Sequence, residues 1–178
     1  MDDLAISTLI PLSEADPAAI ERLLDLAFGP DRHKRTAYAI RGEAACLEAL
    51  CFAAYDEAGQ LVGTIQAYPV ALTDPAGRAH PLIMVGPVAI HPARQGQGFG
   101  RALMAAQASA IESVRAEGAE PLPQVLIGDA PYYGRFGFAE APRGWTCPGP
   151  WEPERLLVRA ANPAVLPRGG MLGPWLSH

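Results

Sequence analysis

A glycine-rich loop between a buried strand and a helix constrains the fold of this chain more than any other feature. It lies in the segment Val88-Ala-Ile-His-Pro-Ala-Arg-Gln-Gly-Gln-Gly-Phe-Gly100. The strand that leads into it, Leu82 to Ile90, is almost continuously apolar, as is typical of a strand covered on both faces. The helical run Arg101 to Glu117 follows the loop, with apolar residues spaced by three and four at Phe99, Leu103, Ala106, Ala110 and Val114. This spacing predicts a helix that packs on the sheet.

The loop has the composition of a phosphate cradle. Gly96, Gly98 and Gly100 carry no side chains that would keep a ligand away from the backbone, and glycine permits positive φ. The first amides of a helix lack intrahelical acceptors and lie at the positive end of the helix dipole. The segment therefore predicts a site for a phosphate or pyrophosphate, with a plain structural turn as the alternative.

The sequence of this loop does not match two other known phosphate-binding motifs. The dinucleotide fingerprint Gly-x-Gly-x-x-Gly would need a third glycine where Arg101 stands. The P-loop needs a lysine followed by serine or threonine, and no lysine follows Gly100. ATP or GTP hydrolysis of the P-loop type is therefore not supported.

Two ordered motifs carry a family resemblance. Gln95-Gly-Gln-Gly-Phe-Gly100, after a strand and at the start of a helix, resembles the Gln/Arg-x-x-Gly-x-Gly/Ala motif of the Gcn5-related N-acetyltransferases (GNAT). The block Val125-Leu-Ile-Gly-Asp-Ala-Pro-Tyr-Tyr-Gly-Arg-Phe-Gly-Phe138 resembles the later strand, tyrosine-bearing short helix and Gly-Phe ending of that superfamily. Together with His91-Pro92, these motifs make the sequence from about Leu4 to Phe138 similar to the YhbS-like group of predicted acetyltransferases.

The resemblance implies a fold and a reaction. The expected fold is α/β (α+β), a mixed and mostly antiparallel sheet flanked by helices, with a central strand that splays from its neighbour near Gly86-Pro87. Gly86-Pro87 would itself favour this opening, because proline has no N–H to donate to a strand ladder and glycine often marks a bulge. The expected reaction is direct transfer of an acetyl group from acetyl-CoA, as co-substrate, to a primary amine.

Residues of the donor site follow from the same motifs. The resemblance places Val88 and Ile90 against the pantetheine arm through strand-like hydrogen bonds. Backbone amides near Val88 could also meet the carbonyl oxygen of the thioester as it gains charge. The pyrophosphate is expected on the loop residues Gln95, Gly96, Gln97, Gly98, Phe99, Gly100 and Arg101. For Arg101 we expect the backbone amide to act, and Arg94 is either a phosphate contact or a solvated side chain.

Tyr133 is the expected catalytic residue. It aligns with the tyrosine that many enzymes of the resembled family use as general acid toward the leaving thiolate. A phenol with an ordinary pKa of about 10 is protonated at neutral pH and can donate its proton. The alternative is a core aromatic whose hydroxyl is merely satisfied, a role that we expect for Tyr132.

Three further polar residues are weaker candidates for a role in the reaction. Asp129 precedes Ala130-Pro131 and is expected to cap a helix, although it could orient a substrate amine. Glu43 could receive the amine proton, and no general base is assigned. His91 is expected to serve a turn rather than to act as a base.

Length, composition and charge bound the remaining possibilities. The chain has 178 residues, a mass of 18.8 kDa and 49% hydrophobic residues, which predicts a single domain over 1–178. A net charge of −5 and a pI near 5.3 argue against nucleic acid as a partner. We expect no membrane span and a cytoplasmic location, because no leader-like start or long apolar run is present. Cys46, Cys51 and Cys147 have no metal-ligand spacing, so we expect free thiols and no metal.

Patterning predicts the remaining elements: an edge strand Ile6–Pro11, helices Ala15–Phe28 and Arg32–Arg41, and a hairpin of Leu50–Tyr55 with Leu61–Ala71. The five basic residues from Arg32 to Arg41 are expected on a solvated helix face, with a substrate-facing role as the alternative. Ten of the 18 prolines follow Glu120, which predicts short strands and loops there.

Several functional alternatives stay open. A non-catalytic acyl-CoA sensor or assembly module would use the same glycine loop without turning over an acceptor. A longer acyl-CoA could replace acetyl-CoA as donor. The acceptor amine, small molecule or protein, is not specified by the sequence. The apolar segment Met171–Leu176 could either close its own sheet or pack on a neighbour in a homodimer.

Overall fold

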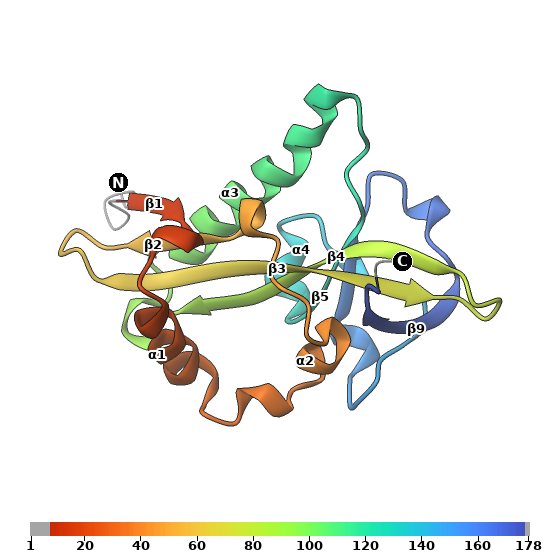
Figure 1. Cartoon of the computed structure of the whole chain (residues 1–178), viewed down its shortest axis with the longest axis horizontal. Coiled ribbons are helices and arrows are strands. Elements are labelled where there is room, and N and C mark those ends of the chain that lie inside the picture. The colour runs from red at the N-terminus through yellow and green to blue at the C-terminus, as the bar shows by residue number, and fades with distance from the viewer. Residues whose placement is uncertain (1–7, 177–178) are drawn as a thin grey trace. The chain divides into compact units, whose positions relative to one another are not determined.

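The computed structural model describes residues 8–176 and shows a mixed α/β fold (Figure 1). The strands are β1 (Thr8–Pro11), β2 (Phe52–Tyr55), β3 (Leu61–Thr73), β4 (Ala79–Ile90), β5 (Gln124–Ile127), β6 (Ala139–Glu140), β7 (Gly144–Thr146), β8 (Leu156–Arg159) and β9 (Gly169–Pro174). The α-helices are α1 (Pro17–Phe28), α2 (Thr36–Arg41), α3 (Phe99–Glu112) and α4 (Ala130–Gly134).

Antiparallel pairing predominates in the sheet, as predicted. The hydrogen-bonded order is β1-β2-β3-β4-β5-β8-β6, and β9 pairs with β3 and β7. The parallel pairs are β4 with β5 and β7 with β9. The chain divides into two compact units, one of residues 1–33, 46–67 and 86–120 and the other of residues 34–45, 68–85 and 121–178. The long strands β3 and β4 run through both units.

In the first unit, α1 and α3 cover opposite faces of the strands (Figure 1). Leu23 and Leu24 of α1 are buried with Ala89 of β4. On the other face α3 approaches β3 so closely that a Cβ on Gly63 would lie 2.9 Å from a methyl carbon of Leu103. The side chains of neighbouring strand residues point to opposite faces, which is why one strand serves both helices.

Two hydrogen bonds from one buried side chain hold α3 in place in the first unit. The side chain of Gln107, 1% exposed, donates from Nε2 to the carbonyl oxygens of Leu50 and Gln66, at 2.8 and 3.1 Å. These bonds satisfy buried polar groups and tie α3 to β3 and to the 3-10 turn η3 (Glu48–Leu50).

The predicted helical run to Glu117 ends as α3 at Glu112 and continues as the 3-10 turn η5 (Ser113–Glu117).

The second unit has its own core, in which the largest fully buried side chain is Trp145. The core also contains Ile40 of α2, Val125 of β5 and Leu172 of β9. Since β9 pairs with β3 from Val70↔Pro174 to Thr73↔Met171, the apolar C-terminal segment closes its own sheet. The short strands and 3-10 turns after residue 120 agree with the proline distribution.

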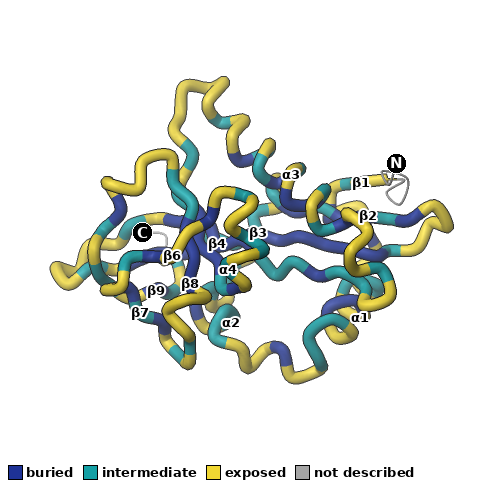
Figure 2. The backbone as a smooth tube through the Cα atoms, turned by 180° about the vertical axis from the view of Figure 1, so that it is seen from behind, coloured by how far each residue is buried: buried dark blue, intermediate teal, exposed yellow. Residues whose placement is uncertain are grey.

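The helix predicted over Arg32–Arg41 is two elements. A 3-10 turn η2 (Arg32–Lys34) precedes α2, and the expectation of a wholly solvated basic face is wrong. Arg32 is 3% exposed and forms ion pairs with Glu21 and Asp25 of α1. These carboxylates are seven and eleven residues earlier, a separation that local patterning does not reveal. Arg32 is buried between exposed neighbours, and Figure 2 shows a buried stretch between exposed ones on the segment that joins α1 to α2.

The other predicted elements are confirmed within a few residues. The helix predicted at Ala15 begins at Pro17, because the Asp16 side chain caps it by accepting from the Ala18 amide at 3.2 Å. The hairpin is β2 with β3, and the described part of the edge strand is β1. The start of that predicted strand, Ile6 and Ser7, lies outside the described residues.

The opening predicted in the central strand is confirmed. The ladder between β4 and β5 consists of Ile83↔Gln124 and Met84↔Val125, both before Gly86. From Leu82 to Val85 the strand is buried, whereas Gly86, Pro87 and Val88 are each half-exposed. The peptide bond between Gly86 and Pro87 is cis. The change in exposure marks the point at which the pairing of β4 with β5 ends.

Cys46, Cys51 and Cys147 are free thiols. Within residues 8–176, no helix combines the length and the hydropathy needed to cross a bilayer. The same range contains no group of three or more His, Cys, Asp or Glu side chains arranged to hold a metal ion.

Candidate active site

The glycine loop presents bare backbone to solvent. Residues Gln95 to Gly98 are all exposed. Gly96 has φ +77° and Gly98 has φ +91°, values that glycine adopts without the steric cost paid by other residues. A Cβ built on either glycine would meet no atom within 4 Å, so the space above both residues is open. This is the shape that a cradle for an anionic group requires.

The loop runs directly into the N-terminus of α3. Gly98 is the N-cap residue, and its carbonyl accepts the first intrahelical bond from the Ala102 amide at 3.0 Å. The amides of Phe99, Gly100 and Arg101 therefore precede the helical ladder and are directed outward at its positive end. Phe99 is 1% exposed, so its side chain is not available to a ligand.

The two side chains that flank the loop are already engaged. His91 Nδ1 accepts from the Ala93 amide at 3.1 Å, which confirms the predicted turn role. Arg94 donates to Asp56 Oδ2 at 2.9 Å. Hydrogen bonds from the Gln60 amide, above all, and from Ala58 and Arg94 hold the pKa of Asp56 below its ordinary range. Arg94 thus braces the β2–β3 turn, which leaves the cradle to backbone groups.

The main chain of Val88 and Ile90 points away from β3. The His91 amide donates to the Val62 carbonyl of β3 at 2.8 Å. Backbone groups alternate sides along a strand, so the amides and carbonyls of Ile90 and Val88 are directed to the opposite side. That is the edge of β4 beyond its last pair with β5. A pantetheine arm would find strand-like donors and acceptors there.

Tyr133 sits on the short helix α4, which Asp129 begins. The Asp129 side chain accepts from the Tyr132 amide at 3.2 Å, with Pro131 in the first turn, so the predicted cap is confirmed. The Tyr133 ring rests on the bare Cα of Gly128, where a Cβ would lie 2.5 Å from its Cε2 atom. Its edge-to-face neighbours are Tyr132 and Phe138, with ring centroids at 4.9 and 6.3 Å.

Burial keeps the Tyr133 phenol protonated. Desolvation is the main cause that raises its pKa to about 12, assisted by Tyr132 and Asp129 and opposed by the positive charge of Arg155. Among the residues that the structure describes, none makes a hydrogen bond to the Tyr133 hydroxyl. The hydroxyl is therefore a proton donor without an internal acceptor. Tyr132, which we expected in the core, is only half-buried, as is Tyr133 itself.

The structure divides the predicted residues into two groups. Val88, Ile90 and the loop residues Gln95–Arg101 belong to the first unit, whereas Tyr133, Asp129 and Glu43 belong to the second. Glu43 is exposed just after α2. Sequence analysis missed the role of Gly128, although the letter lies in the Tyr133 motif. Arg41 is one of the five basic residues for which a solvated face was expected and a substrate-facing role was the alternative, and its guanidinium lies over the rings of Tyr38 and Tyr68.

Comparisons with known proteins agree with this arrangement. A family model described as acetyltransferase (GNAT) domain matches residues 48–140. No curated protein matches the chain in sequence.

Solved structures share the fold over most of the chain. The GNAT family N-acetyltransferase YhbS from Escherichia coli, in complex with CoA, is 23% identical, covers 98% of this chain and 93% of its own, and has a TM-score of 0.69. A GNAT family acetyltransferase from Brucella melitensis, in complex with acetyl-CoA, is 26% identical, with coverages of 91% and 92% and a TM-score of 0.59. Arabidopsis thaliana Naa50, in complex with a bisubstrate analogue, is 17% identical, with coverages of 85% and 95% and a TM-score of 0.53.

Proposed function

Because this chain belongs to the acetyltransferase (GNAT) domain family, we propose that it transfers an acetyl group from acetyl-CoA directly to a primary amine. Acyl transfer is the activity common to that family and to the structural neighbours of this chain. The observation that carries the finer proposal is the open, side-chain-free glycine loop at the N-terminus of α3, next to a strand edge whose backbone groups have lost their partner.

The donor site is built mainly from backbone groups in this proposal. The amides of the loop and of Phe99, Gly100 and Arg101 hold the pyrophosphate of CoA. Val88 and Ile90 hydrogen-bond the pantetheine arm with their main-chain groups, and the Val88 amide meets the thioester oxygen as charge develops on it. The acetyl-CoA complex of the Brucella melitensis relative supports acetyl-CoA as the donor.

The chemistry balances with two substrates and no covalent enzyme intermediate. The neutral amine nitrogen attacks the thioester carbon, a C–N bond forms, and the C–S bond breaks as the tetrahedral intermediate collapses. The nitrogen loses one proton to water, with the exposed Glu43 as the side-chain candidate to relay it. The leaving sulfur gains one proton from the Tyr133 hydroxyl, which water then reprotonates. The products are the N-acetylated amine and CoA.

Tyr133 suits the role of general acid because its environment favours the neutral phenol. With a pKa of about 12 it remains fully protonated at neutral pH. Its hydroxyl has no acceptor among the described residues to compete for that proton. A sulfur that leaves within reach of this hydroxyl would accept a hydrogen bond from it as negative charge develops.

The experiment that tests the proposal measures CoA release with a panel of primary amines, for the wild type, Tyr133→Phe and Tyr132→Phe. We expect Tyr133→Phe to lower kcat about 100- to 10,000-fold, the usual contribution of a general acid. Its acetyl-CoA affinity should not change, and Tyr132→Phe should behave like the wild type.

The same assay separates the rival function, a non-catalytic acyl-CoA sensor. Acetyl-CoA binding without acetylation of any amine would favour the sensor. Acetylation that Tyr133→Phe leaves unchanged would refute the general-acid role but retain the transferase. A donor series of longer acyl-CoAs compares chain lengths in the same assay.

A further inference from the structure

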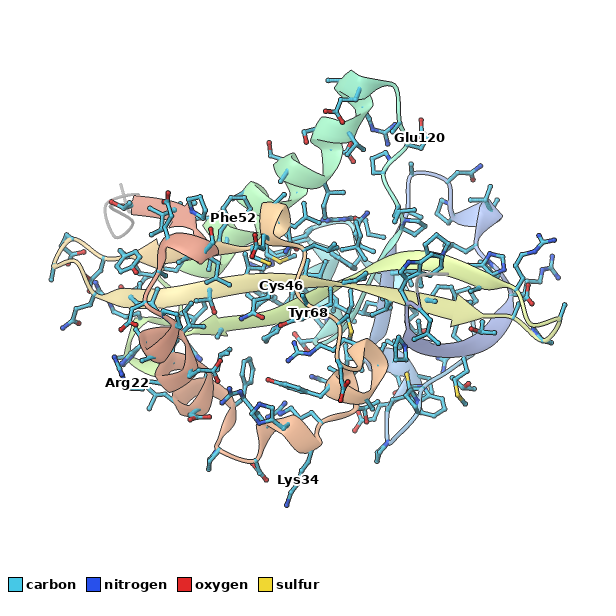
Figure 3. All side chains as sticks on the ribbon, in the orientation of Figure 1. Arg22, Lys34, Cys46, Phe52, Tyr68 and Glu120 are labelled. Atoms are coloured by element: carbon cyan, nitrogen blue, oxygen red, sulfur yellow. The ribbon has the colours of Figure 1, made fainter. Side chains whose placement is uncertain are left out.

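A guanidinium held by aromatic rings lies at the C-terminal end of α2. The Cζ atom of Arg41 is 3.8 Å from the ring centroid of Tyr38 and 4.0 Å from that of Tyr68. Tyr68, on β3, is labelled in Figure 3. All three residues belong to the second unit, as does Tyr133. Ring faces attract a cation and fix the plane of the guanidinium, but they carry no charge to neutralise it.

Four arginines, Arg32, Arg94, Arg115 and Arg143, are paired with carboxylates, whereas Arg41 is not. Arg94 lies 2.9 Å from Asp56, Arg115 lies 2.6 Å from Glu112, and Arg143 lies 3.1 Å from Glu140. In the part of the chain that the structure describes, Arg41 makes only its two ring contacts, with no ion pair and no hydrogen bond. A half-buried guanidinium in this condition has unused N–H donors, which an anion from outside would satisfy.

Tertiary contacts at both ends fix the helix that carries Arg41. Thr36 Oγ1 donates to the Pro150 carbonyl at 2.5 Å at the start of α2. Ile40 is fully buried, and Gly42 has φ +60° and lies so near Pro174 that a Cβ would be 2.7 Å from its Cγ atom. A helix of six residues is not stable by itself, so these contacts determine its position. Arg41 is therefore presented by a fixed support.

The same core supports α2 and the strand that leads to Tyr133. Ile40, next to Arg41, and Ile127, next to Gly128, belong to one cluster of packed apolar side chains. Gly128 in turn receives the Tyr133 ring. Arg41 and the proposed general acid are thus attached to one packed body, the second unit, as a substrate-orienting residue and a catalytic residue need to be.

We propose that Arg41, oriented by Tyr38 and Tyr68, binds a carboxylate of the acceptor, so that the preferred substrates are primary amines that carry a carboxylate. This inference rests on the acetyltransferase function proposed above. The N–H donors of a guanidinium lie in its plane, where two of them match the two oxygens of a planar carboxylate. Arg41 is then a specificity-determining residue, and Tyr38 and Tyr68 are positioning residues.

The test compares amines with and without the negative charge. Glycine, β-alanine and γ-aminobutyrate are each paired with their amide, which keeps the amine and the chain length but removes the carboxylate. Acetylation of each is measured as kcat/KM for the wild type, Arg41→Gln and Arg41→Lys. Binding of the same compounds to the CoA-loaded protein is measured by calorimetry, so that the result does not depend on turnover. Arg78→Gln, an exposed arginine of the same unit, is the control for net charge.

We expect Arg41→Gln to lower kcat/KM and affinity for at least one amino acid about 10- to 100-fold, the usual effect of losing a charged hydrogen bond. Its effect on the matching amide should be less than about threefold on the same principle. Arg41→Lys should recover only part of the loss, because lysine keeps the charge but not the fork. Acetyl-CoA affinity should be unchanged in both variants, which shows that they are folded.

Three results would overturn the inference. One is equal use of amino acids and amides by the wild type. Another is an equal loss for both in Arg41→Gln. The third is tighter, Arg41-dependent binding of aminoalkyl phosphonates, which would assign a phosphate in place of a carboxylate. Carboxylate-dependent binding that needs Arg41, without any acetylation, would instead retain this inference and refute the proposed transferase.

Discussion

The glycine loop and the surroundings of Tyr133 contribute to the proposed site in opposite ways. The loop is exposed, and its working groups are backbone amides made accessible by glycines with positive φ. Tyr133 is the one side chain proposed to take part in the chemistry; packing against Gly128, Tyr132 and Phe138 sets its position, and desolvation raises its pKa. Substitutions of loop side chains should therefore matter little, whereas small changes in packing around Tyr133 should matter greatly.

The largest expected effect that sharpens this contrast comes from Gly128→Ala. The added Cβ would lie 2.5 Å from the Tyr133 ring, so the ring has to move. Displacement of a catalytic group by about 1 Å can cost about 100-fold in rate, and we expect kcat to fall about 10- to 100-fold with acetyl-CoA affinity unchanged.

The matched control is Gly134→Ala in α4, where a Cβ meets nothing within 4 Å and φ is not positive. It should leave kcat unchanged. If Gly128→Ala has wild-type kcat, the Tyr133 ring does not need its observed position and the contrast fails.

A smaller effect is expected in the loop. Gln97 is exposed between Gly96 and Gly98, and only its backbone is assigned to the cradle. Gln97→Ala should therefore change the Kd for acetyl-CoA by less than about threefold, because an exposed side chain outside special features contributes little. A tenfold or greater loss, measured by calorimetry, would show that the side chain and not the backbone binds the cofactor.

The smallest effect concerns pH. Burial raises the pKa of Tyr133 to about 12, so the donating, neutral phenol persists as pH rises and is lost only as pH approaches that value. At saturating amine, kcat should stay constant within about twofold from pH 8 to about pH 10.5. An alkaline fall with an apparent pKa near 10, present in the wild type and absent from Tyr133→Phe, would contradict the assigned environment.

Local patterns made much of the fold and the geometry of the glycine loop predictable from the sequence. The apolar run into the glycine loop, the spacing in α3 and the Asp129-x-Pro131 cap depend on neighbours within a few residues. The Gly86-Pro87 opening was predictable for the same reason, since proline acts on its own strand.

What escaped prediction depends on residues far apart in the chain. Arg32 is buried because Glu21 and Asp25 of α1 meet it. Arg41 is held by Tyr68, which is 27 residues later and on a different element. In the sequence Gly128 is only one letter of a motif. The structure explains why glycine is needed there, because the ring of Tyr133 lies against its Cα. Side-chain sites assembled by tertiary packing leave no local period or spacing to detect.

The measurement that tests the central claim most directly is calorimetric titration of the protein with acetyl-CoA, for the wild type, Gly98→Glu and Gly118→Glu. Gly118 is the control because it also has positive φ, +82°, and open space, but lies at the far end of α3 and η5. We predict that the wild type and Gly118→Glu bind acetyl-CoA and that Gly98→Glu does not, because its carboxylate would occupy the pyrophosphate cradle. Binding by Gly98→Glu equal to that of the wild type, or no binding by the wild type, would contradict the account.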